Sequence, residues 1–269
     1  MRIVITGGRG YIGTNLVKYL HEKDGDMIID IYDKVDKLRA ENIQDLGYYD
    51  FVVHLAAISG IAASKNDLSG AIRDNVSAAF HVFNKSLTAD NIPRVIFASS
   101  QAAKTPEANF YAMTKYMAET EAQRLNRIYP INISILRFTN VYGGIDYLEK
   151  KDTVVSRFMN LAKKKECIVI NGDGSQIRDF IHVNDICEII YRVIKANGIR
   201  KIIDVGSGVE TSIMSLAKMF DTEFTYDRLS DSIGTSKNVA DISDLKELLD
   251  FTPTLKLTDY IKEELSKEA

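Results

Sequence analysis

The stretch VITGGRGYIG, residues 4–13, decides the fold that we predict for this chain. An apolar, strand-like run ends at Gly7, and further glycines follow at Gly10 and Gly13, where a segment of helical periodicity begins. Glycines so spaced allow a tight turn, close approach of the backbone to a phosphate, and close contact between helix and strand. The loop therefore predicts a dinucleotide site in which N–H groups at the start of the helix bind a pyrophosphate.

A carboxylate supports this interpretation. Asp33 follows Gly13 by 20 residues and ends the second apolar run, where it can accept hydrogen bonds from the adenosine ribose. Asp33 favours NAD because it would repel the 2′-phosphate of NADP, whereas Arg9 and Lys34 favour NADP. We expect NAD, with NADP as the alternative.

Apolar runs alternate with helical segments in the first half of the chain. Strands are predicted over 2–6, 27–33, 50–57, 94–99 and 131–138, and helices over 11–23, 68–89 and 109–129. The strands are apolar on both faces, which is typical of a parallel sheet covered on both sides. We therefore predict an α/β fold with a Rossmann-type, doubly wound parallel sheet.

The regular alternation of predicted strands and helices ends after about residue 141. Predicted there are a helix over 154–164, a glycine-punctuated stretch, a helix over 184–196 capped by Asn184, a strand over 201–205, and short helices, one capped by Ser243. We expect a smaller α/β C-terminal part that binds substrate. The predicted dinucleotide-binding domain comprises 1–141 plus 177–205, and the substrate-binding domain comprises 142–176 plus 206–269.

Composition narrows the classes of partner. A net charge of −3 over 269 residues gives no reason to expect nucleic acid or an anionic membrane, and no apolar run is long enough to span a bilayer. Cys167 and Cys187 belong to no metal-binding pattern, so we expect no metal site. We expect a cytoplasmic protein.

The order of several motifs resembles one enzyme family. The segments TGGRGYIG, VVHLAA, SSQA, YAMTK, LRFTNVYGG, NGDGSQIRDFIHVNDI and DVGSG resemble the extended short-chain dehydrogenase/reductases, specifically the NAD-dependent epimerase/dehydratase family. The resemblance covers nearly the whole chain. It implies an enzyme that acts on a nucleotide-diphosphate sugar and a homodimer formed through the helices predicted over 68–89 and 109–129.

The glycine loop and the resemblance together supply the candidate site residues. The catalytic set is Ser100, Tyr111 and Lys115. The cofactor-binding set is Gly7, Arg9, Gly10, Tyr11, Ile12, Gly13, Asp33, Asn42, Ile43, Leu55, Ala56, Ala57, Asn75, Ser99, Tyr111 and Lys115. The substrate-binding set is Ser100, Asn140, Val154, Arg178, Arg228 and Asp231.

The chemistry of the catalytic set follows from its spacing. Tyr111 and Lys115 are four residues apart and share a helical face, so the ammonium should favour tyrosinate and lower the tyrosine pKa. Ser100 should hydrogen-bond the substrate oxygen. Gln101 and Ala102 occupy positions at which the 4,6-dehydratases of the family carry an acidic pair, which argues against dehydration.

We therefore expect an NAD-dependent nucleotide-sugar epimerase that acts at C4 of a UDP-hexose. The first alternative is an NADPH-dependent reductase of 4-keto sugar nucleotides. The second is a non-catalytic dinucleotide-binding protein, against which the complete Ser–Tyr–Lys set argues. The loop between Ser100 and Tyr111 is shorter than is usual in the family, and Lys104 stands where a tyrosine is common.

Overall fold

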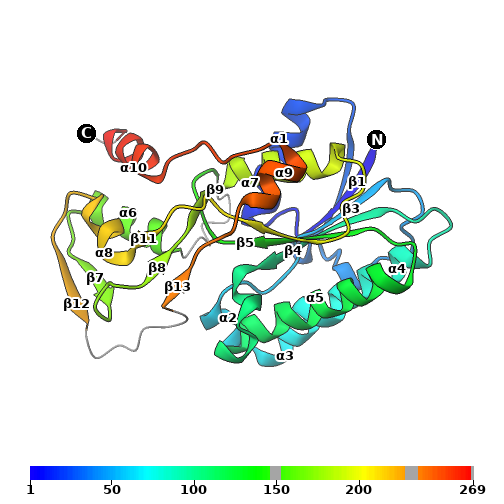
Figure 1. Cartoon of the computed structure of the whole chain (residues 1–269), viewed down its shortest axis with the longest axis horizontal. Helices are drawn as coiled ribbons and strands as arrows, with labels where there is room; N and C mark the ends of the chain where they lie inside the picture. Colours follow the sequence, from blue (N-terminus) through cyan, green and yellow to red (C-terminus); the bar gives the residue numbers. More distant parts are fainter. Residues whose placement is uncertain (146–152, 228–235, 268–269) are drawn as a thin grey trace.

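A six-stranded parallel sheet forms the centre of the computed structural model, which describes residues 1–145, 153–227 and 236–267 (Figure 1). Its strands are β1 (Arg2–Thr6), β2 (Ile28–Tyr32), β3 (Phe51–His54), β4 (Arg94–Ser100), β5 (Ile133–Phe138) and β10 (Ile202–Val205), in the order β10-β5-β4-β3-β1-β2. All neighbouring pairs are parallel, which confirms the predicted fold class. Arg228 and Asp231 lie outside the described residues.

Helices cover both faces of the sheet because its strands carry apolar side chains on both sides (Figure 1). Ile3 and Ile5 of β1 point to one core, whereas Val4 points to the other, as the alternation of side chains along a strand requires. The first core contains side chains of α1 (Tyr11–Lys23), α7 (Val183–Lys195) and α9 (Ser243–Leu249). The second contains side chains of α4 (Ala78–Leu87) and α5 (Phe110–Ile128).

The helix predicted over 68–89 is irregular. It consists of α3 (Leu68–Ala71), the π-helical turn η3 (Ile72–Ser77) and α4, and the short helix α2 (Ile61–Asn66) precedes it. A π-turn widens the helix locally and is often found at functional sites. This turn contains Asn75, one of the predicted cofactor residues.

Two predicted helix caps are wrong. His182, and not Asn184, caps α7, because its Nδ1 accepts the Asn184 N–H at 3.1 Å and the helix begins at Val183. Ser243 is already the first residue of α9, and its N–H donates to Asp241 Oδ1 at 3.0 Å. In both cases a side chain upstream of the expected one satisfies the free N–H group.

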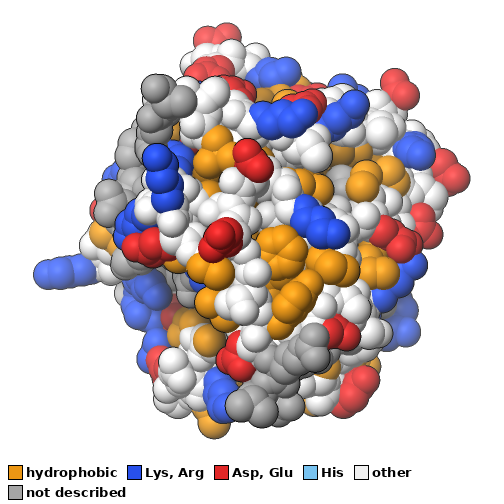
Figure 2. Space-filling view, turned by 90° about the vertical axis from the view of Figure 1, so that its left-hand side faces the viewer, with side chains coloured by type: hydrophobic (Ala, Val, Ile, Leu, Met, Phe, Trp, Pro, Cys, Tyr) orange, Lys and Arg blue, Asp and Glu red, His pale blue; other side chains and the backbone are white. Residues whose placement is uncertain are grey.

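The C-terminal part is built from short elements around a third core. These are β6 (Asn140–Tyr142), α6 (Val154–Lys163), β7 (Ile168–Asn171), β8 (Ile177–Arg178), β9 (Phe180–His182), β11 (Thr211–Ser212), α8 (Ile213–Lys218), β12 (Phe224–Asp227), β13 (Lys237–Asn238) and α10 (Leu257–Ser266). Tyr142, Phe158, Phe180 and Phe220 are the buried aromatic side chains of that core. Figure 2 shows this end of the molecule, where hydrophobic side chains gather among charged ones.

The position of helix α9 does not fit a division of the chain into two domains by continuous sequence ranges. Its Leu245 and Leu249 pack in the core of the central sheet, although α9 follows several elements of the C-terminal part. The predicted domain boundaries stay a prediction. In the described part of the chain, no helix combines the length and the apolar character needed to cross a membrane.

Candidate active site

The glycine loop is closed so tightly that two of its residues have no room for a side chain. Gly7 has φ +73°, and a Cβ on it would lie 2.7 Å from the backbone nitrogen of Ala56. A Cβ on Gly13 would lie 2.2 Å from the carbonyl oxygen of Gly7. The loop thereby brings the end of β1, the segment after β3 and the start of α1 together.

A cavity of about 370 Å³ opens over this loop. It is lined by Gly7, Arg9, Gly10, Tyr11, Ile12, Gly13, Tyr32, Asp33, Lys34, Val35, Arg39, Ala40, Glu41, Leu55, Ala56, Ala57, Ser59, Asp74, Ala78 and Ala98. Gly10 is the N-cap of α1 and offers no side-chain acceptor, so the first N–H groups of the helix face the cavity without a side-chain cap. Such a helix start suits a pyrophosphate.

Asp33 lies at this cavity with its carboxylate already oriented. Its Oδ2 accepts the N–H of Arg9 at 3.0 Å, and its Oδ1 accepts the N–H of Val35 at 3.1 Å. The Arg9 side chain pairs with Asp36 at 3.0 Å. The guanidinium that could have recognised a ribose phosphate is therefore held by a neighbouring carboxylate.

Six predicted cofactor residues are absent from the described lining of this cavity: Asn42, Ile43, Asn75, Ser99, Tyr111 and Lys115. Asn42 is exposed, and Ile43 is buried in the second core with its carbonyl oxygen 2.8 Å from His81 Nε2. Asn75 is buried, and its side-chain amide binds both the N–H and the C=O of Ile58. Asn75 thus holds the loop after β3, whose Ala57 lines the cavity.

Charged residues that the sequence motifs did not indicate also line this cavity. Arg39 pairs with Glu41 and with Asp74, both at 2.6 Å. These side chains come from the segment after β2 and from η3, so their proximity is a long-range contact that no local motif indicates.

A second cavity, of about 210 Å³, lies beside the first. Ser59 lines the first cavity and the next residue, Gly60, lines the second; likewise Ala98 lines the first cavity and Ser100, two residues further along β4, lines the second. The second cavity is lined by Gly60, Ile61, Ser100, Gln101, Ala102, Thr105, Ala108, Asn109, Tyr111, Phe138, Thr139, Asn140, Arg178 and Asn238. Four predicted residues, Ser100, Tyr111, Asn140 and Arg178, therefore meet here.

Ser100 and Tyr111 reach the second cavity from two elements. Ser100 ends β4 and caps the turn η4 (Gln101–Lys104), accepting the N–H of Ala102 at 3.2 Å. Tyr111 lies in the first turn of α5. Burial raises the pKa of Tyr111, and a hydrogen bond with Ser100 opposes that rise. The predicted lowering of this pKa is therefore not found, because desolvation disfavours tyrosinate more strongly than Ser100 favours it.

Lys115 is buried and is not part of the described lining of either cavity. Its Nζ donates to the carbonyl oxygen of Ala98 at 2.9 Å and lies 5.3 Å from the centre of the Phe97 ring. Burial lowers the pKa of Lys115 to about 8, and the carboxylate of Glu119 opposes this shift. His54 lies nearby in the core, where burial and the charge of Lys115 lower its pKa to about 3.

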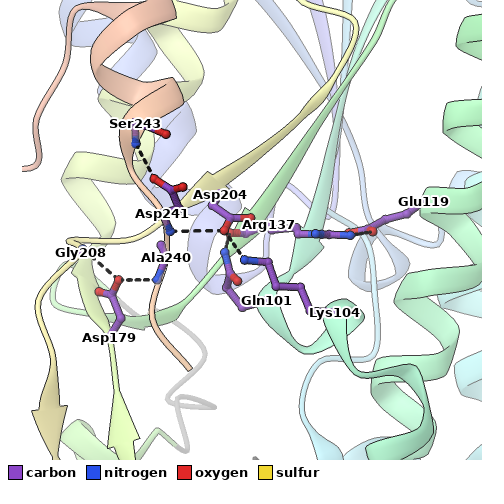
Figure 3. Close-up of polar contacts among 10 residues, drawn as sticks. All are labelled: Gln101, Lys104, Glu119, Arg137, Asp179, Asp204, Gly208, Ala240, Asp241 and Ser243. Atoms are coloured by element: carbon purple, nitrogen blue, oxygen red, sulfur yellow. Dashed lines mark hydrogen bonds and ion pairs between the residues drawn. The ribbon is translucent and has the colours of Figure 1, made fainter. Parts of the chain in front are cut away.

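Arg178 brings a cation to the substrate side of the second cavity. Its guanidinium donates to the carbonyl oxygen of Ile177 at 2.9 Å and to Gln176 Oε1 at 3.1 Å, and burial lowers its pKa. The next residue, Asp179, is fully buried and accepts the N–H groups of Ser207, Gly208 and Ala240 (Figure 3). These contacts fix the backbone that carries Arg178.

Two further predicted residues point elsewhere. Val154 packs against the third core, at the start of α6, and is not part of the described lining. The Ser99 hydroxyl donates to Glu119 Oε1 at 2.5 Å in the buried interior. Ser99 and Ser100 are neighbours on a strand, so their side chains lie on opposite faces and only Ser100 reaches the cavity.

Sequence motifs also missed a buried ion pair below the site. Arg137 on β5 forms two hydrogen bonds to the carboxylate of Glu119, at 2.8 and 2.6 Å (Figure 3). Two signals were present in the sequence: an arginine inside an apolar strand, and a glutamate one helical turn after Lys115.

The turn after Ser100 is also fastened to the sheet. Lys104 forms an ion pair with Asp204 at the end of β10, and Asp204 also accepts the N–H of Asp241 at 3.3 Å (Figure 3). The side-chain amide of Gln101 donates to the carbonyl oxygen of Arg137 at 3.4 Å. The short loop that departs from the family pattern is thus held by contacts with β5 and β10.

The fold and the two cavities define a Rossmann-type α/β protein with a dinucleotide-type glycine loop and an adjacent Ser–Tyr site. Residues 3–206 match the model of the NAD dependent epimerase/dehydratase family. The chain belongs to this family, and its relatives include proteins named as sugar-nucleotide epimerases, dehydratases and reductases.

Individual relatives are distant. The chain is 28% identical over 261 residues to a putative UDP-glucose 4-epimerase of Methanocaldococcus jannaschii, covering 83% of each chain. It is 26% identical to the dTDP-4-dehydro-6-deoxy-D-allose reductase of Streptomyces bikiniensis, covering 93% of this chain and 91% of that one. The solved structure of UDP-glucuronic acid 4-epimerase from Bacillus cereus, in complex with UDP-glucuronic acid and NAD, superposes with a TM-score of 0.85 at 22% identity, covering 100% and 99% of the two chains.

Proposed function

We propose that this chain is an NAD-dependent nucleotide-sugar epimerase, which oxidises and re-reduces one hydroxyl-bearing carbon, C4 of a UDP-hexose, through a keto intermediate. The observation that carries the proposal is the cavity shared by Ser100, Tyr111, Asn140 and Arg178, directly beside the glycine-loop cavity. Relatives named as UDP-glucose 4-epimerases and structures solved with NAD and UDP-sugars support it.

The glycine-loop cavity suits NAD. The uncapped N–H groups of α1 would hold the pyrophosphate, and the carboxylate of Asp33 would accept hydrogen bonds from the adenosine ribose. The pairing of Arg9 with Asp36 supports NAD over NADP. When bound, the nicotinamide accepts hydride from the sugar carbon and later returns it.

The protein moves the proton. Tyr111, hydrogen-bonded to Ser100, is placed to take the proton of the sugar hydroxyl and to give it back after the sugar has turned over. Lys115, whose pKa of about 8 lies near neutral pH, supplies a positive charge one helical turn away. That charge favours the deprotonated form of the base during the reaction.

Arg178 supports the choice of a nucleotide-diphosphate substrate. A guanidinium can bind two phosphate oxygens at once, and burial in the cavity strengthens such a contact. An enzyme that holds its substrate by the diphosphate leaves the sugar ring free to turn, as epimerisation at one carbon requires.

The test is to incubate the protein with NAD and each of UDP-glucose, UDP-galactose, UDP-glucuronic acid and UDP-N-acetylglucosamine, and to separate the products by chromatography. Tyr111→Phe should lower the rate at least about 100-fold, because general acid–base catalysis contributes that much. Tyr116→Phe, on an exposed position of the same helix, is the matched control. Interconversion of none of these sugars would contradict the proposal, and NADPH oxidation by a 4-keto sugar nucleotide would identify the reductase instead.

A homodimer is part of the proposal. Phe80 of α4 and Met113 and Met117 of α5 are each more than a third exposed, on the two helices that cover one face of the sheet. Burial of such side chains against a second copy would be favourable. Light scattering should report a dimer, and Met117→Glu should shift it towards monomer; a wild-type monomer would contradict this assignment.

A further inference from the structure

Glu119 lies one helical turn after Lys115 on α5 and is completely buried. Its carboxylate accepts the Ser99 hydroxyl at 2.5 Å and two guanidinium N–H groups of Arg137 at 2.8 and 2.6 Å. Ser99 and Arg137 are register partners on β4 and β5. One carboxylate therefore connects the helix α5 to two neighbouring strands, next to the residue Ser100 at the end of β4; Figure 3 shows its contact with Arg137.

We propose that Glu119 is a positioning residue of the active site, which fixes Ser100 relative to Tyr111 and stabilises the ammonium form of Lys115 through its charge. This inference rests on the proposed function, because it assigns a role within the same catalytic set.

The positioning role follows from a series of contacts between α5 and the end of β4. In successive helical turns, Tyr111 hydrogen-bonds Ser100, Lys115 binds the carbonyl oxygen of Ala98, and Glu119 binds the hydroxyl of Ser99. The contacts of Lys115 and Glu119 are buried, so water does not compete for them and each has a narrow range of geometry, whereas Tyr111 and Ser100 line the second cavity. The Glu119 contact holds the side chain of Ser99 to the interior face and thereby leaves the next side chain on the cavity face.

The electrostatic role follows from the charges around Lys115. On its own helix these are Glu119 and the neutral Tyr111, on β3 there is His54, and on β5 there is Arg137, which pairs with Glu119. Burial keeps His54 neutral by lowering its pKa to about 3. Glu119 thus acts on the ammonium from its own helix, and its charge is in turn paired with the guanidinium of Arg137 on β5.

This arrangement gives the two members of the pair opposite effects on Lys115. Without the carboxylate, the remaining guanidinium repels the ammonium and favours loss of its proton. Without the guanidinium, the remaining carboxylate attracts the ammonium more strongly. If the pair acted only through packing, both substitutions would shift the pKa of Lys115 in the same direction.

The experiment measures NADH affinity by fluorescence titration between pH 6 and 10 for the full-length wild type, Glu119→Gln and Arg137→Gln. The affinity should fall at high pH as Lys115 loses its proton. We expect the pH midpoint of this fall in affinity to be lower by on the order of one pH unit in Glu119→Gln and higher by a similar amount in Arg137→Gln. Midpoints that stay in place, or that move in the same direction in both variants, would overturn the inference.

A lone buried charge is destabilising, so the double variant Glu119→Gln/Arg137→Gln is included. It carries neither charge, and its midpoint should lie between those of the single variants. Ser99→Ala keeps both charges, so it should leave the midpoint unchanged while lowering kcat several-fold. Glu121→Gln, which breaks an exposed pair with Arg124 on the same helix, is the control and should change neither quantity.

The readout separates this inference from the proposed function because NADH binding requires no sugar substrate. If the pH midpoints of NADH affinity move in opposite directions in the two variants but the protein epimerises no sugar, the role of Glu119 is supported and the proposed reaction is contradicted. If the protein is an epimerase but the pH midpoint of NADH affinity is the same in both variants as in the wild type, the reaction is supported and the role of Glu119 is contradicted.

Discussion

The ammonium group of Lys115 lies 2.9 Å from the carbonyl oxygen of Ala98, and the lysine exposes only 4% of its surface. In the described part of the chain this carbonyl is the one hydrogen-bond acceptor of the ammonium, in place of the water that would surround the charge in the unfolded chain. Burial accordingly lowers the lysine pKa to about 8 from 10.5. The residue that suits the site for proton chemistry therefore weakens the fold.

Replacing Lys115 with Met should stabilise the protein at pH 7, by about 2 kcal/mol, because each pKa unit corresponds to about 1.4 kcal/mol and part of the gain is lost with the contact to Ala98. The folded pKa lies below the unfolded one, so the unfolded chain binds more protons between about pH 8 and 10.5. Wild-type stability should therefore rise across that window, and the advantage of the variant should shrink. Urea unfolding at pH 7 and pH 10 checks both points; a variant less stable than wild type at pH 7 would contradict them.

His54 should make the fold sensitive to acid. Its Nδ1 lies 2.6 Å from Thr6 Oγ1, its Nε2 has no hydrogen-bond partner among the described residues, and its pKa is lowered to about 3. The unfolded histidine binds a proton below about pH 6.5 and the folded one does not, so stability falls as pH drops from there towards 3. His54→Phe should reduce this slope in urea unfolding curves. His21→Phe, at an exposed position of α1, should leave the slope as it is.

Arg178→Gln should raise the KM for the nucleotide sugar at least about tenfold, because a buried charged hydrogen bond to the diphosphate is worth roughly 1.5–3 kcal/mol. Arg178→Lys should recover part of the loss, since an ammonium cannot bind two oxygens in the same planar manner. Steady-state kinetics measure both. Arg124→Gln, on the exposed face of α5, serves as the control. An unchanged KM in Arg178→Gln would show that the diphosphate binds elsewhere.

Asp33 and Asp36 should act in different ways on the choice between NAD and NADP. Asp33→Asn removes the charge that would repel a 2′-phosphate and should lower the preference for NADH over NADPH about tenfold. Asp36→Asn releases the Arg9 guanidinium and should increase NADPH affinity while leaving NADH affinity close to wild type. Fluorescence titrations with both cofactors provide the measurement. Unaltered NADPH binding in both variants would place cofactor selection at other residues, such as Arg39.

The parts of the site that the sequence predicted are those carried by local patterns. Gly7 to Gly13 lie in one loop, and Tyr111 and Lys115 lie on one helical turn, so spacing alone brings each set together. The positions of the strands could also be predicted from the sequence, because β1 and β4 are short apolar runs whose side chains point alternately to the two faces of the sheet. The starts of helices were harder to predict, because the cap of α7 depended on whether His182 or Asn184, two residues apart, occupies the N-cap position.

The amino-acid sequence by itself determined the doubly wound sheet and the glycine loop, because these depend on periodicity and on residues close together in the chain. The catalytic role of the Ser–Tyr–Lys set was inferred from the resemblance to the family and stays a prediction. Only the tertiary structure decided that Arg178 joins Ser100 in one cavity and that Glu119 binds both Ser99 and Arg137. It also decided the direction of the Tyr111 pKa shift. These outcomes depend on which surfaces lose water and which strands become neighbours, and both are properties of the packed chain rather than of any segment of it.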